Sequence, residues 1–473
     1  MPIQDLRDFI AKVEAMGELK RIDGADWDLE IGALAEVARS MPKGPLLLFD
    51  HVKGYPQGYR VATNIQNTWR RVALALDLSP DTPTDQIGKV LRGKLRNIKP
   101  VPPVEAKDAP VKENILLGED VDLFRFPIPR WHELDKGRYI GTADMVIMRD
   151  PDTGMVQIGT YRVQAHNRNT AGSFIEPAKH GNMIRQKYWE RGQSCPVAVC
   201  LGQDPLLFAM ASSPAPLEYS EYEIAGYLRG QPVEVTRGEV TGLPIPARAE
   251  IVLEGEIPPP SEEVHPEGPF GEWTGYYASG ERDEPVIRVK AILHRNDPIL
   301  AGSSPPSEGI GGGYGVLYDT FEWLSLERCG VTDVVGLRSY GAAMTVISVK
   351  QRYPGHGKRA ALAYLQAVRL ANIRFVVAVD EDINPSDLRE VIWAIGTRCD
   401  PATALDIVRS CAASSLDTRL TPEERTRGVN SVARAIIDAC RPFEWREQFP
   451  PVNVLSAETR EATVQKWGRV LGL

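Results

Sequence analysis

The spacing of apolar residues predicts helices and a strand in alternation at the start of the chain. Residues 1–20 have the pattern of an amphipathic helix, and residues 29–40 (LEIGALAEVARS) again repeat apolar side chains at helical spacing. The apolar run PLLLFDHV, at 45–52, predicts a short buried strand. Residues 1–110 therefore predict an N-terminal α/β domain, which ends in a proline-rich stretch at 96–118 that predicts an extended linker.

Short strand patterns separated by glycine and proline turns dominate residues 119–305. Examples are ADMVIMRD, MVQIGTYRVQAH, PVAVCLG, AEIVLEGEI and PVIRVKAILHR, and one helical pattern, GNMIRQKYWERG, interrupts them. Many short strands with turn signals predict a barrel or a sandwich of mainly antiparallel strands. The pattern therefore indicates a second domain.

Strands and helices alternate again after the glycine-rich stretch GIGGGYG at 309–315. RAALAYLQAVRL has one apolar face at helical spacing, and IRFVVAVDEDI is a nearly continuous apolar strand, typical of a parallel sheet covered on both faces. Asn384 and Pro385 predict the cap and the first-turn proline of the next helix, DLREVIWAIGTRC. Residues 306–450 therefore predict a C-terminal α/β domain with helices on both faces of its sheet.

The end of the chain, residues 451–473, predicts a short amphipathic helix after Pro450 and Pro451. Such a helix packs either on another subunit or on its own domain, and the sequence leaves both open. Taken together, the patterns predict a multidomain protein of the α/β, or α+β, class.

Composition excludes several classes of protein. The chain has 473 residues, 43% apolar and 25% charged, which is typical of a globular protein and too long for one ordinary core. Its 55 lysines and arginines against 63 acidic residues give a net charge of -8, which opposes non-specific binding to nucleic acid. No apolar run is long enough to cross a bilayer, and the N-terminus lacks a secretory pattern, so we expect a cytoplasmic protein.

Common catalytic and metal-binding motifs are absent from the sequence. The six cysteines form no CxxC pair, which favours reduced thiols in or near cores over a zinc ribbon or a disulfide framework. No GxxxxGK[ST], HExxH or GxSxG occurs. GIGGGYG lacks the preceding buried strand and the following acidic residue of a dinucleotide fingerprint, so a flexible loop bordering a pocket fits it better.

The segment HPEGPFGEWTGYY, at 265–277, carries two carboxylates in an irregular stretch. Glu267 and Glu272 are five residues apart, a spacing that regular structure would place on different faces. Gly268 and Pro269 break that regularity and allow both carboxylates to face one cavity, where one of them would be held protonated near neutral pH. An exposed acidic turn would show the same spacing, and the spacing alone favours it.

Three further residues are candidates for a site. Arg162 is the one charged residue among the apolar and small neighbours of VQIGTYRVQAH, which predicts a strand. A buried guanidinium there needs an anionic partner, in a functional site or in an ordinary structural salt bridge. His180 and Glu221 could share a hard divalent cation with phosphate oxygens, although a lone histidine is usually only hydrogen-bonded.

Five segments, in this order, resemble the UbiD family of reversible decarboxylases, which use prenylated flavin mononucleotide (prenylated FMN). They are WHELDKGRYIGTADMVIMRD, IGTYRVQAHNRN, SEYEIAGYLRG, PEGPFGEWTGYY and VDEDINPSDLREVIWAIGTRC. The resemblance runs from about residue 5 to residue 450, and its last three segments together are highly specific. It implies an N-terminal α/β domain, a central split β-barrel that binds the flavin, a C-terminal α/β domain and a homo-oligomer.

The resemblance implies catalytic and cofactor-binding roles for residues of this chain. It places the family's Arg–Glu–Glu triad on Arg162, Glu267 and Glu272. The cofactor would accept the electrons of the carbon that loses CO2, Glu272 would protonate that carbon, and Arg162 with Glu267 would tune the protonation of Glu272. The cofactor-binding positions that it implies are Gln157, Ile158, Gly159, Thr160, Tyr161, Arg162, Lys179, His180, Ser213 and Glu221.

Two metal ions are implied by the same resemblance. A divalent ion, Mn2+ or Mg2+, would hold the cofactor phosphate through Gln157, His180 and Glu221, with glutamine at a position that is usually asparagine. Glutamine offers the same amide oxygen on a longer arm. A K+ ion would lie near the backbone carbonyls of Ala211 and Ser212.

The function that the resemblance implies is non-oxidative decarboxylation of an α,β-unsaturated or (hetero)aromatic carboxylic acid, reversible at high CO2. The alternative is a flavin-binding subunit of a larger multi-subunit carboxylase, inactive alone. In either case a separate flavin prenyltransferase would supply the cofactor. Residues 302–318, with Leu317 as a wall residue, would form part of the substrate pocket, and Arg374 is the nearest counterpart of a family lysine.

Overall fold

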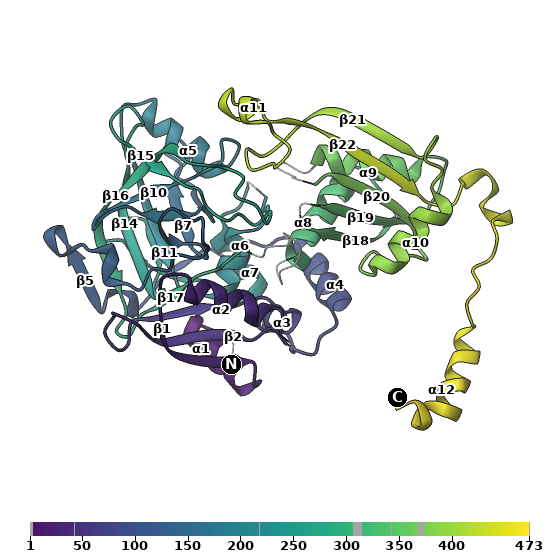
Figure 1. The fold of residues 1–473 in the computed structure, drawn as a ribbon, viewed down its shortest axis with the longest axis horizontal. Helices are drawn as coiled ribbons and strands as arrows, with labels where there is room; N and C mark the ends of the chain where they lie inside the picture. The colour runs from purple at the N-terminus through teal and green to yellow at the C-terminus, as the bar shows by residue number, and fades with distance from the viewer. Residues whose placement is uncertain are drawn as a thin grey trace.

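The computed structural model of the chain describes residues 3–41, 43–216, 218–305, 315–341, 343–367 and 373–472. The strands of these residues form four sheets of four, ten, three and five strands. Figure 1 shows the four-stranded and the ten-stranded sheets together in one lobe and the five-stranded sheet in a second lobe. The glycine-rich loop predicted at 309–315 lies outside the described residues except for its last glycine.

The N-terminal part of the structure confirms the helices and the strand predicted for the start of the chain, and it contains a four-stranded sheet. Its order is β1-β2-β3-β17, so a late strand joins the sheet of the first 75 residues. The apolar run at 45–52 forms a largely buried interior strand of this sheet, because alternate side chains pack against helices on one face and against the large sheet on the other. The elements are α1 (Leu6–Ala15), β1 (Leu19–Ala25), α2 (Glu30–Arg39), β2 (Leu46–Val52), β3 (Arg60–Thr63), α3 (Trp69–Ala75), α4 (Thr84–Leu95) and β17 (Ile299–Ala301).

The central sheet is antiparallel throughout, as its alternating pattern predicts. Its order is β6-β9-β10-β16-β14-β11-β7-β8, and β5 and β15 pair with the long strand β16. The strands are β5 (Asn114–Leu117), β6 (Arg138–Gly141), β7 (Met145–Arg149), β8 (Val156–Gly159), β9 (Val163–Ala165), β10 (Thr170–Ser173), β11 (Cys195–Leu201), β14 (Ile251–Ile257), β15 (Val264–Glu267) and β16 (Arg282–His294).

Helices and a small sheet border the central sheet. The proline-rich stretch predicted as a linker is extended, but two of its short strands pair with this part of the molecule, β4 with β12 and β5 with β16. The elements are β4 (Val104–Glu105), η1 (Pro110–Lys112), η2 (Gly118–Asp120), η3 (Leu123–Arg125), α5 (His180–Trp189), α6 (Pro205–Ala211), α7 (Glu221–Arg229), β12 (Glu234–Arg237) and β13 (Pro244–Pro246). The exact domain boundaries proposed from the sequence stay a prediction.

Arg162 does not lie within a strand, which corrects the sequence interpretation of VQIGTYRVQAH. β8 ends at Gly159 and β9 begins at Val163. The ring of Tyr161 packs where side chains of Gly159 and Gly181 would otherwise stand, and its hydroxyl accepts a hydrogen bond from the Gly181 amide at 3.1 Å. The buried tyrosine therefore interrupts the strand and leaves Arg162 on a connection between β8 and β9.

The C-terminal sheet has parallel strands at its centre and helices on both faces, as predicted. Its order is β18-β19-β20-β22-β21; the three central strands are parallel and both edge strands are antiparallel. Along β20, Val376 and Ala378 pack with α9, whereas Val377 and Val379 pack with α10. The elements are α8 (Gly315–Arg328), β18 (Val334–Tyr340), β19 (Met344–Val349), α9 (His356–Ala367), β20 (Phe375–Asp380), α10 (Leu388–Arg398), β21 (Leu405–Ala412), α11 (Pro422–Thr426), β22 (Ser431–Ala439) and η4 (Phe443–Gln448).

The cap predicted for α10 is wrong by three residues. The side chain of Asp387 accepts hydrogen bonds from the first amides of the helix, including Arg389 at 2.9 Å, and so forms the N-cap. Asn384 instead accepts from the Ser386 amide at 3.0 Å, in a turn that precedes the helix. Asparagine and aspartate side chains both favour turns and helix caps. Here Asn384 stabilises the turn that contains Pro385, and Asp387 caps the helix.

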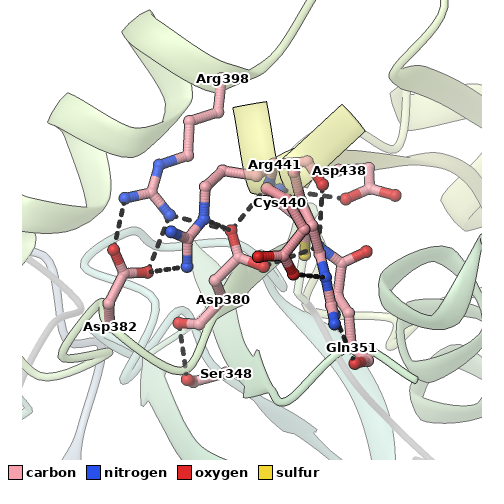
Figure 2. Close-up of polar contacts among 10 residues, drawn as sticks. Ser348, Gln351, Asp380, Asp382, Arg398, Asp438, Cys440 and Arg441 are labelled. Carbon is pink, nitrogen blue, oxygen red and sulfur yellow. Dashed lines mark hydrogen bonds and ion pairs between the residues drawn. The ribbon is translucent and has the colours of Figure 1, made fainter. Parts of the chain in front are cut away.

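A buried ionic network stabilises the carboxyl ends of β20 and β22 (Figure 2). Arg398 contacts Asp380 at 2.9 Å and both oxygens of Asp382 at 2.8 and 2.9 Å. Asp380 also accepts from the Arg441 amide at 2.7 Å and from the side chain of Gln351 at 2.7 Å. Every carboxylate oxygen named here has a donor, so the network joins α10 to the sheet.

The last helix, α12 (Ala457–Leu471), stands apart from both lobes at the end of an extended stretch (Figure 1). Among its described residues Gly468 is the one that is buried, and Trp467 is 50% exposed. Of the two packing arrangements that the sequence left open, packing on its own domain is therefore not the one observed. None of the helices in the described ranges has the length and apolarity needed to cross a membrane.

Candidate active site

Arg162 joins the two glutamates of the segment at 265–277. Its Nε and Nη2 atoms donate to Glu267 at 2.7 and 2.5 Å, a bidentate pair, and its Nη1 forms an ion pair with Glu272. The exposed fractions are 0% for Glu267 and 6% for Glu272. The exposed acidic turn that the spacing favoured is therefore wrong, because both carboxylates are buried against one guanidinium.

The backbone between the two glutamates explains how they converge. Glu267 ends β15, and Gly268 follows with φ at +85°, a conformation that disfavours any residue with a side chain. A Cβ on Gly268 would lie less than 3.0 Å from the carbonyl oxygen of Gly280. This glycine lets the chain turn sharply and brings Glu272 back toward Arg162.

Aromatic rings surround the guanidinium. The ring of Phe174 lies 4.6 Å from the Arg162 Cζ, and that of Phe270 lies 5.5 Å away. The Arg162 Nη2 also donates to the Ser279 hydroxyl at 3.2 Å. Rings on its faces and carboxylates on its edge exclude water from the cation, which strengthens its interaction with both acids.

A cavity of about 420 Å³ brings together most of the positions predicted to bind a cofactor. Its walls come from the end of β8, the start of α5, the end of α6 and the start of α7, and α8 faces them from the C-terminal lobe. The predicted positions on its walls are Gln157, Ile158, Gly159, Thr160, Tyr161, Lys179, His180, Ala211, Ser212, Ser213 and Glu221. Arg162, which was also predicted to bind the cofactor, does not line this cavity: it directly follows Tyr161 and pairs with Glu267 and Glu272.

The residues predicted to hold a divalent cation suit one chemically. Gln157, His180 and Glu221 offer an amide oxygen, an imidazole nitrogen and a carboxylate. The Gln157 Oε1 is buried and has no hydrogen-bond partner among the residues that the structure describes. Burial raises the pKa of Glu221 to about 7, against a 2.9 Å hydrogen bond from the Ile158 amide that favours its charged form. A bound cation would give the Gln157 Oε1 a partner and would stabilise the charged carboxylate of Glu221.

The dipoles of two helices favour bound charges at the cavity: an anion at the start of α5 and a cation at the end of α6. Lys179 and His180 begin α5, where the positive end of the helix dipole and a cationic side chain suit an anion such as a phosphate. Ala211 ends α6 and Ser212 follows it, so the negative helix end offers carbonyl oxygens to a cation there. Ser213 donates to the Ala209 carbonyl at 2.6 Å.

Two other residues singled out from the sequence lie away from these walls. Leu317 is 2% exposed and packs in the core between α8 and α4. Arg374 pairs with Asp417 at 2.7 and 2.9 Å and is not among the residues that line the cavity.

Sequence reasoning missed the wall that α8 and α9 supply to the cavity. Its side chains come from the C-terminal lobe, about 100 or more residues after the rest of the site. One signal was present in the sequence: two acids, Asp319 and Glu322, lie one helical turn apart in the largely apolar run LYDTFEWLSL. The residues missed on this wall are Glu322, Ser325, Arg328, Cys329 and Ala367, whereas Tyr318 ends the segment 302–318 that was predicted to line the substrate pocket.

Comparisons with known proteins agree with this geometry. Residues 10–91, 103–308 and 320–439 match, in turn, the N-terminal, Rift-related and C-terminal domains described for 3-octaprenyl-4-hydroxybenzoate carboxy-lyase, UbiD. The chain is 33% identical over 456 residues to phenolic acid decarboxylase of Streptomyces sp. (strain D7), and 32% identical over 457 residues to that of Bacillus subtilis (strain 168). Each match covers 93% of both chains.

Solved structures show the same fold. The closed form of vanillic acid decarboxylase from Sedimentibacter hydroxybenzoicus has a TM-score of 0.87 at 29% identity, covering 98% of this chain and 99% of its own. The UbiD-class enzyme HmfF from Pelotomaculum thermopropionicum, in complex with FMN, has a TM-score of 0.82 at 29% identity, covering 96% and 98%. Fold and sequence together define a carboxy-lyase. The chain belongs to the UbiD family.

Proposed function

We propose that this enzyme catalyses the non-oxidative decarboxylation of an α,β-unsaturated or (hetero)aromatic carboxylic acid, reversibly at high CO2, with prenylated FMN as cofactor. The relatives named as phenolic acid and vanillic acid decarboxylases support an aromatic acid as substrate. Neighbours solved with FMN and with prenylated FMN support the cofactor. The observation that carries the proposal is the buried contact of one guanidinium with two carboxylates.

When bound, prenylated FMN supplies an electron sink for the carbon that loses CO2. The chain supplies the proton. Glu272 in its acid form donates a proton to that carbon after the bond to CO2 breaks, and it is left as a carboxylate beside Arg162. Arg162 stabilises that charge, Glu267 holds the guanidinium in place and as a second carboxylate favours the return of a proton to Glu272, and protonation from water resets the acid. In the carboxylation direction, Glu272 acts as the base.

The cavity residues support a bound phosphate and its metal ions. Gln157, His180 and Glu221 would hold Mn2+ or Mg2+, and the carbonyls of Ala211 and Ser212 would hold K+. We further propose a homo-oligomer in the cytoplasm, which depends on a flavin prenyltransferase for its cofactor. The apolar side chains that α12 exposes, Val464, Trp467, Val470 and Leu471, support an oligomer.

The test is to produce the chain together with a flavin prenyltransferase and to screen ring-bearing and vinylic carboxylic acids for CO2 release. Exchange of a ring or vinyl proton with D2O is measured in parallel, because it reports the reacting carbon even where decarboxylation is slow. Arg162→Ala should abolish both signals while the protein stays folded. Full activity of this variant would contradict the proposal.

A second candidate is a flavin-binding subunit of a larger carboxylase. The vanillic acid decarboxylase is described as ShVdcCD, and one of its structures as containing truncated ShVdcD, which favours a second component in that system. The purified chain, loaded with cofactor, separates the two candidates. Turnover by the single chain supports the self-sufficient decarboxylase, and turnover only after addition of cell extract supports the subunit.

A further inference from the structure

Glu322 is a buried carboxyl group on the wall of the cavity opposite the predicted cofactor residues. It lies on α8, in the C-terminal lobe, and is 3% exposed. No role described so far uses it. A carboxyl group buried at a cavity wall is costly unless a partner or a ligand satisfies it.

One oxygen of Glu322 is fully occupied by hydroxyl groups behind it. Its Oε2 accepts from the Tyr364 hydroxyl at 2.7 Å and from the Ser339 hydroxyl at 3.0 Å. Thr345 lies within 2.9 Å of the Tyr364 oxygen and 3.2 Å of the Ser339 oxygen and completes the cluster. The Oε1 atom has no hydrogen-bond partner within the described part of the chain.

The charge state of Glu322 follows from its neighbours. Asp319, one turn earlier, has a cation beside it, Arg338 at 3.3 Å, and accepts from the Ser339 amide at 3.0 Å. No lysine or arginine of the described ranges forms an ion pair with Glu322. Burial, with Asp319 nearby, raises the pKa of Glu322 to about 8, so the protonated form dominates at neutral pH. Because two hydroxyls donate to Oε2, the proton belongs on Oε1.

We propose that Glu322 is a ligand-binding residue whose Oε1–H donates a hydrogen bond to an anionic oxygen of the molecule bound in the cavity. The C-terminal lobe then takes part in ligand binding directly. This inference rests on the proposed function for the identity of the ligand, which offers two such oxygens: the phosphate of the flavin and the carboxylate of the substrate.

An anion suits the cavity better than a cation at this wall. Lys179 and the start of α5 face the cavity from the other side and attract an anion. A neutral donor adds a charge-assisted hydrogen bond to it, whereas an ionised Glu322 would repel it. The hydroxyl cluster behind Oε2 therefore directs the acid proton to the position where an anion can accept it.

The test compares two variants of the full-length protein that differ in the donor. Glu322→Gln keeps an N–H donor and an oxygen that accepts from Tyr364 and Ser339, whereas Glu322→Met keeps the size and removes the donor. FMN and riboflavin, which lacks the phosphate, are titrated into the cofactor-free protein by flavin fluorescence at pH 7. Benzoate is titrated into the FMN-loaded protein as the aromatic carboxylate. Circular dichroism verifies folding.

If the partner is the phosphate, Glu322→Met should bind FMN at least about tenfold more weakly and riboflavin equally well, while Glu322→Gln stays close to wild type. If the partner is the substrate carboxylate, the loss should appear for benzoate instead. Unchanged affinity for all three probes in a folded Glu322→Met variant would overturn the proposal, as would equal losses in both variants. These binding readouts do not depend on CO2 release, so failure of the proposed function is seen separately.

A second measurement tests the proposal without the Glu322→Met variant, in case that variant does not fold. FMN affinity is followed from pH 7 to pH 9 in the wild type and in Glu322→Gln. The titratable groups beside Glu322 are Tyr318, Asp319 and Tyr364, and they are the same in both proteins. Only the wild type should lose affinity for its anionic partner as Glu322 ionises, and parallel profiles for FMN and benzoate would overturn the proposal.

Discussion

Substitution of Gly268 by alanine tests whether the bend after β15 positions the two glutamates. Gly268 has φ at +85°, and a Cβ there would lie less than 3.0 Å from the carbonyl oxygen of Gly280. Gly280 offers a matched control, because its φ is +63° but a Cβ on it would have no atom within 4 Å. The two alanine variants share the backbone strain, and only one of them has the steric overlap.

The magnitudes follow from this difference. The strained conformation costs about 1–2 kcal/mol for an alanine, partly offset by about 0.4–1 kcal/mol from the less flexible unfolded chain. Gly280→Ala should therefore lose roughly 1 kcal/mol of unfolding free energy. In Gly268→Ala the new Cβ would also overlap the carbonyl oxygen of Gly280, which costs roughly 1–3 kcal/mol more. One backbone must move by roughly half an ångström to one ångström, and such a displacement of Glu267 and Glu272 would cost about 100-fold in turnover.

The assays are urea unfolding of the cofactor-free proteins and CO2 release by the loaded enzymes. Gly268→Ala should be the less stable variant and should lose about 100-fold in rate, while Gly280→Ala keeps its rate within a few-fold. Equal stability and equal rates in the two variants would refute the idea that the close approach of these two backbones positions the glutamates.

Three other perturbations have expected outcomes. Arg398→Met removes the guanidinium that pairs with buried Asp380 and partly exposed Asp382, both of which keep contacts with Arg441, and should cost about 1–3 kcal/mol in urea unfolding, whereas Lys358→Met, in a half-exposed pair, should cost less than about 1 kcal/mol. The folded-state pKa of Glu322 is raised to about 8 from 4.5, so the wild type should lose stability relative to Glu322→Gln as pH rises from about 5 to 8, by a few kcal/mol; flat differences across that range would contradict this. Removal of divalent metal by a chelator should release FMN from the wild type, and Gln157→Ala should bind Mn2+ at least tenfold more weakly; unchanged metal affinity would exclude the glutamine as a ligand.

The strands of the two large sheets could be predicted from the sequence because their apolar patterns reflect burial directly. β20 reads as a continuous apolar run since helices cover both its faces, and β14 and β16 lie between turn residues. The predicted strand boundaries were wrong where a single side chain determines the residue at which a strand ends. The ring of Tyr161 ends β8 through a contact with Gly181, and no local pattern contains that contact.

The candidate site, like the fold, could be predicted from the sequence only in part. Spacing alone favoured an exposed turn for Glu267 and Glu272, because their common partner, Arg162, is 105 residues away from the first of them. Only the family resemblance joined the three in advance. Glu322 was missed for the same reason: its helix faces the cavity through the packing of two lobes, which sequence spacing does not encode.

The most direct measurement is deuterium incorporation by the cofactor-loaded enzyme in D2O, compared between the wild type and Glu272→Gln. Flavin absorbance verifies that both proteins retain the cofactor. The wild type should place one deuterium on the carbon that carried the carboxylate, and Glu272→Gln should do so at least about 100-fold more slowly. Equal rates of incorporation and CO2 release in the two proteins would contradict the role of Glu272 as the proton donor, and with it the roles proposed for Arg162 and Glu267.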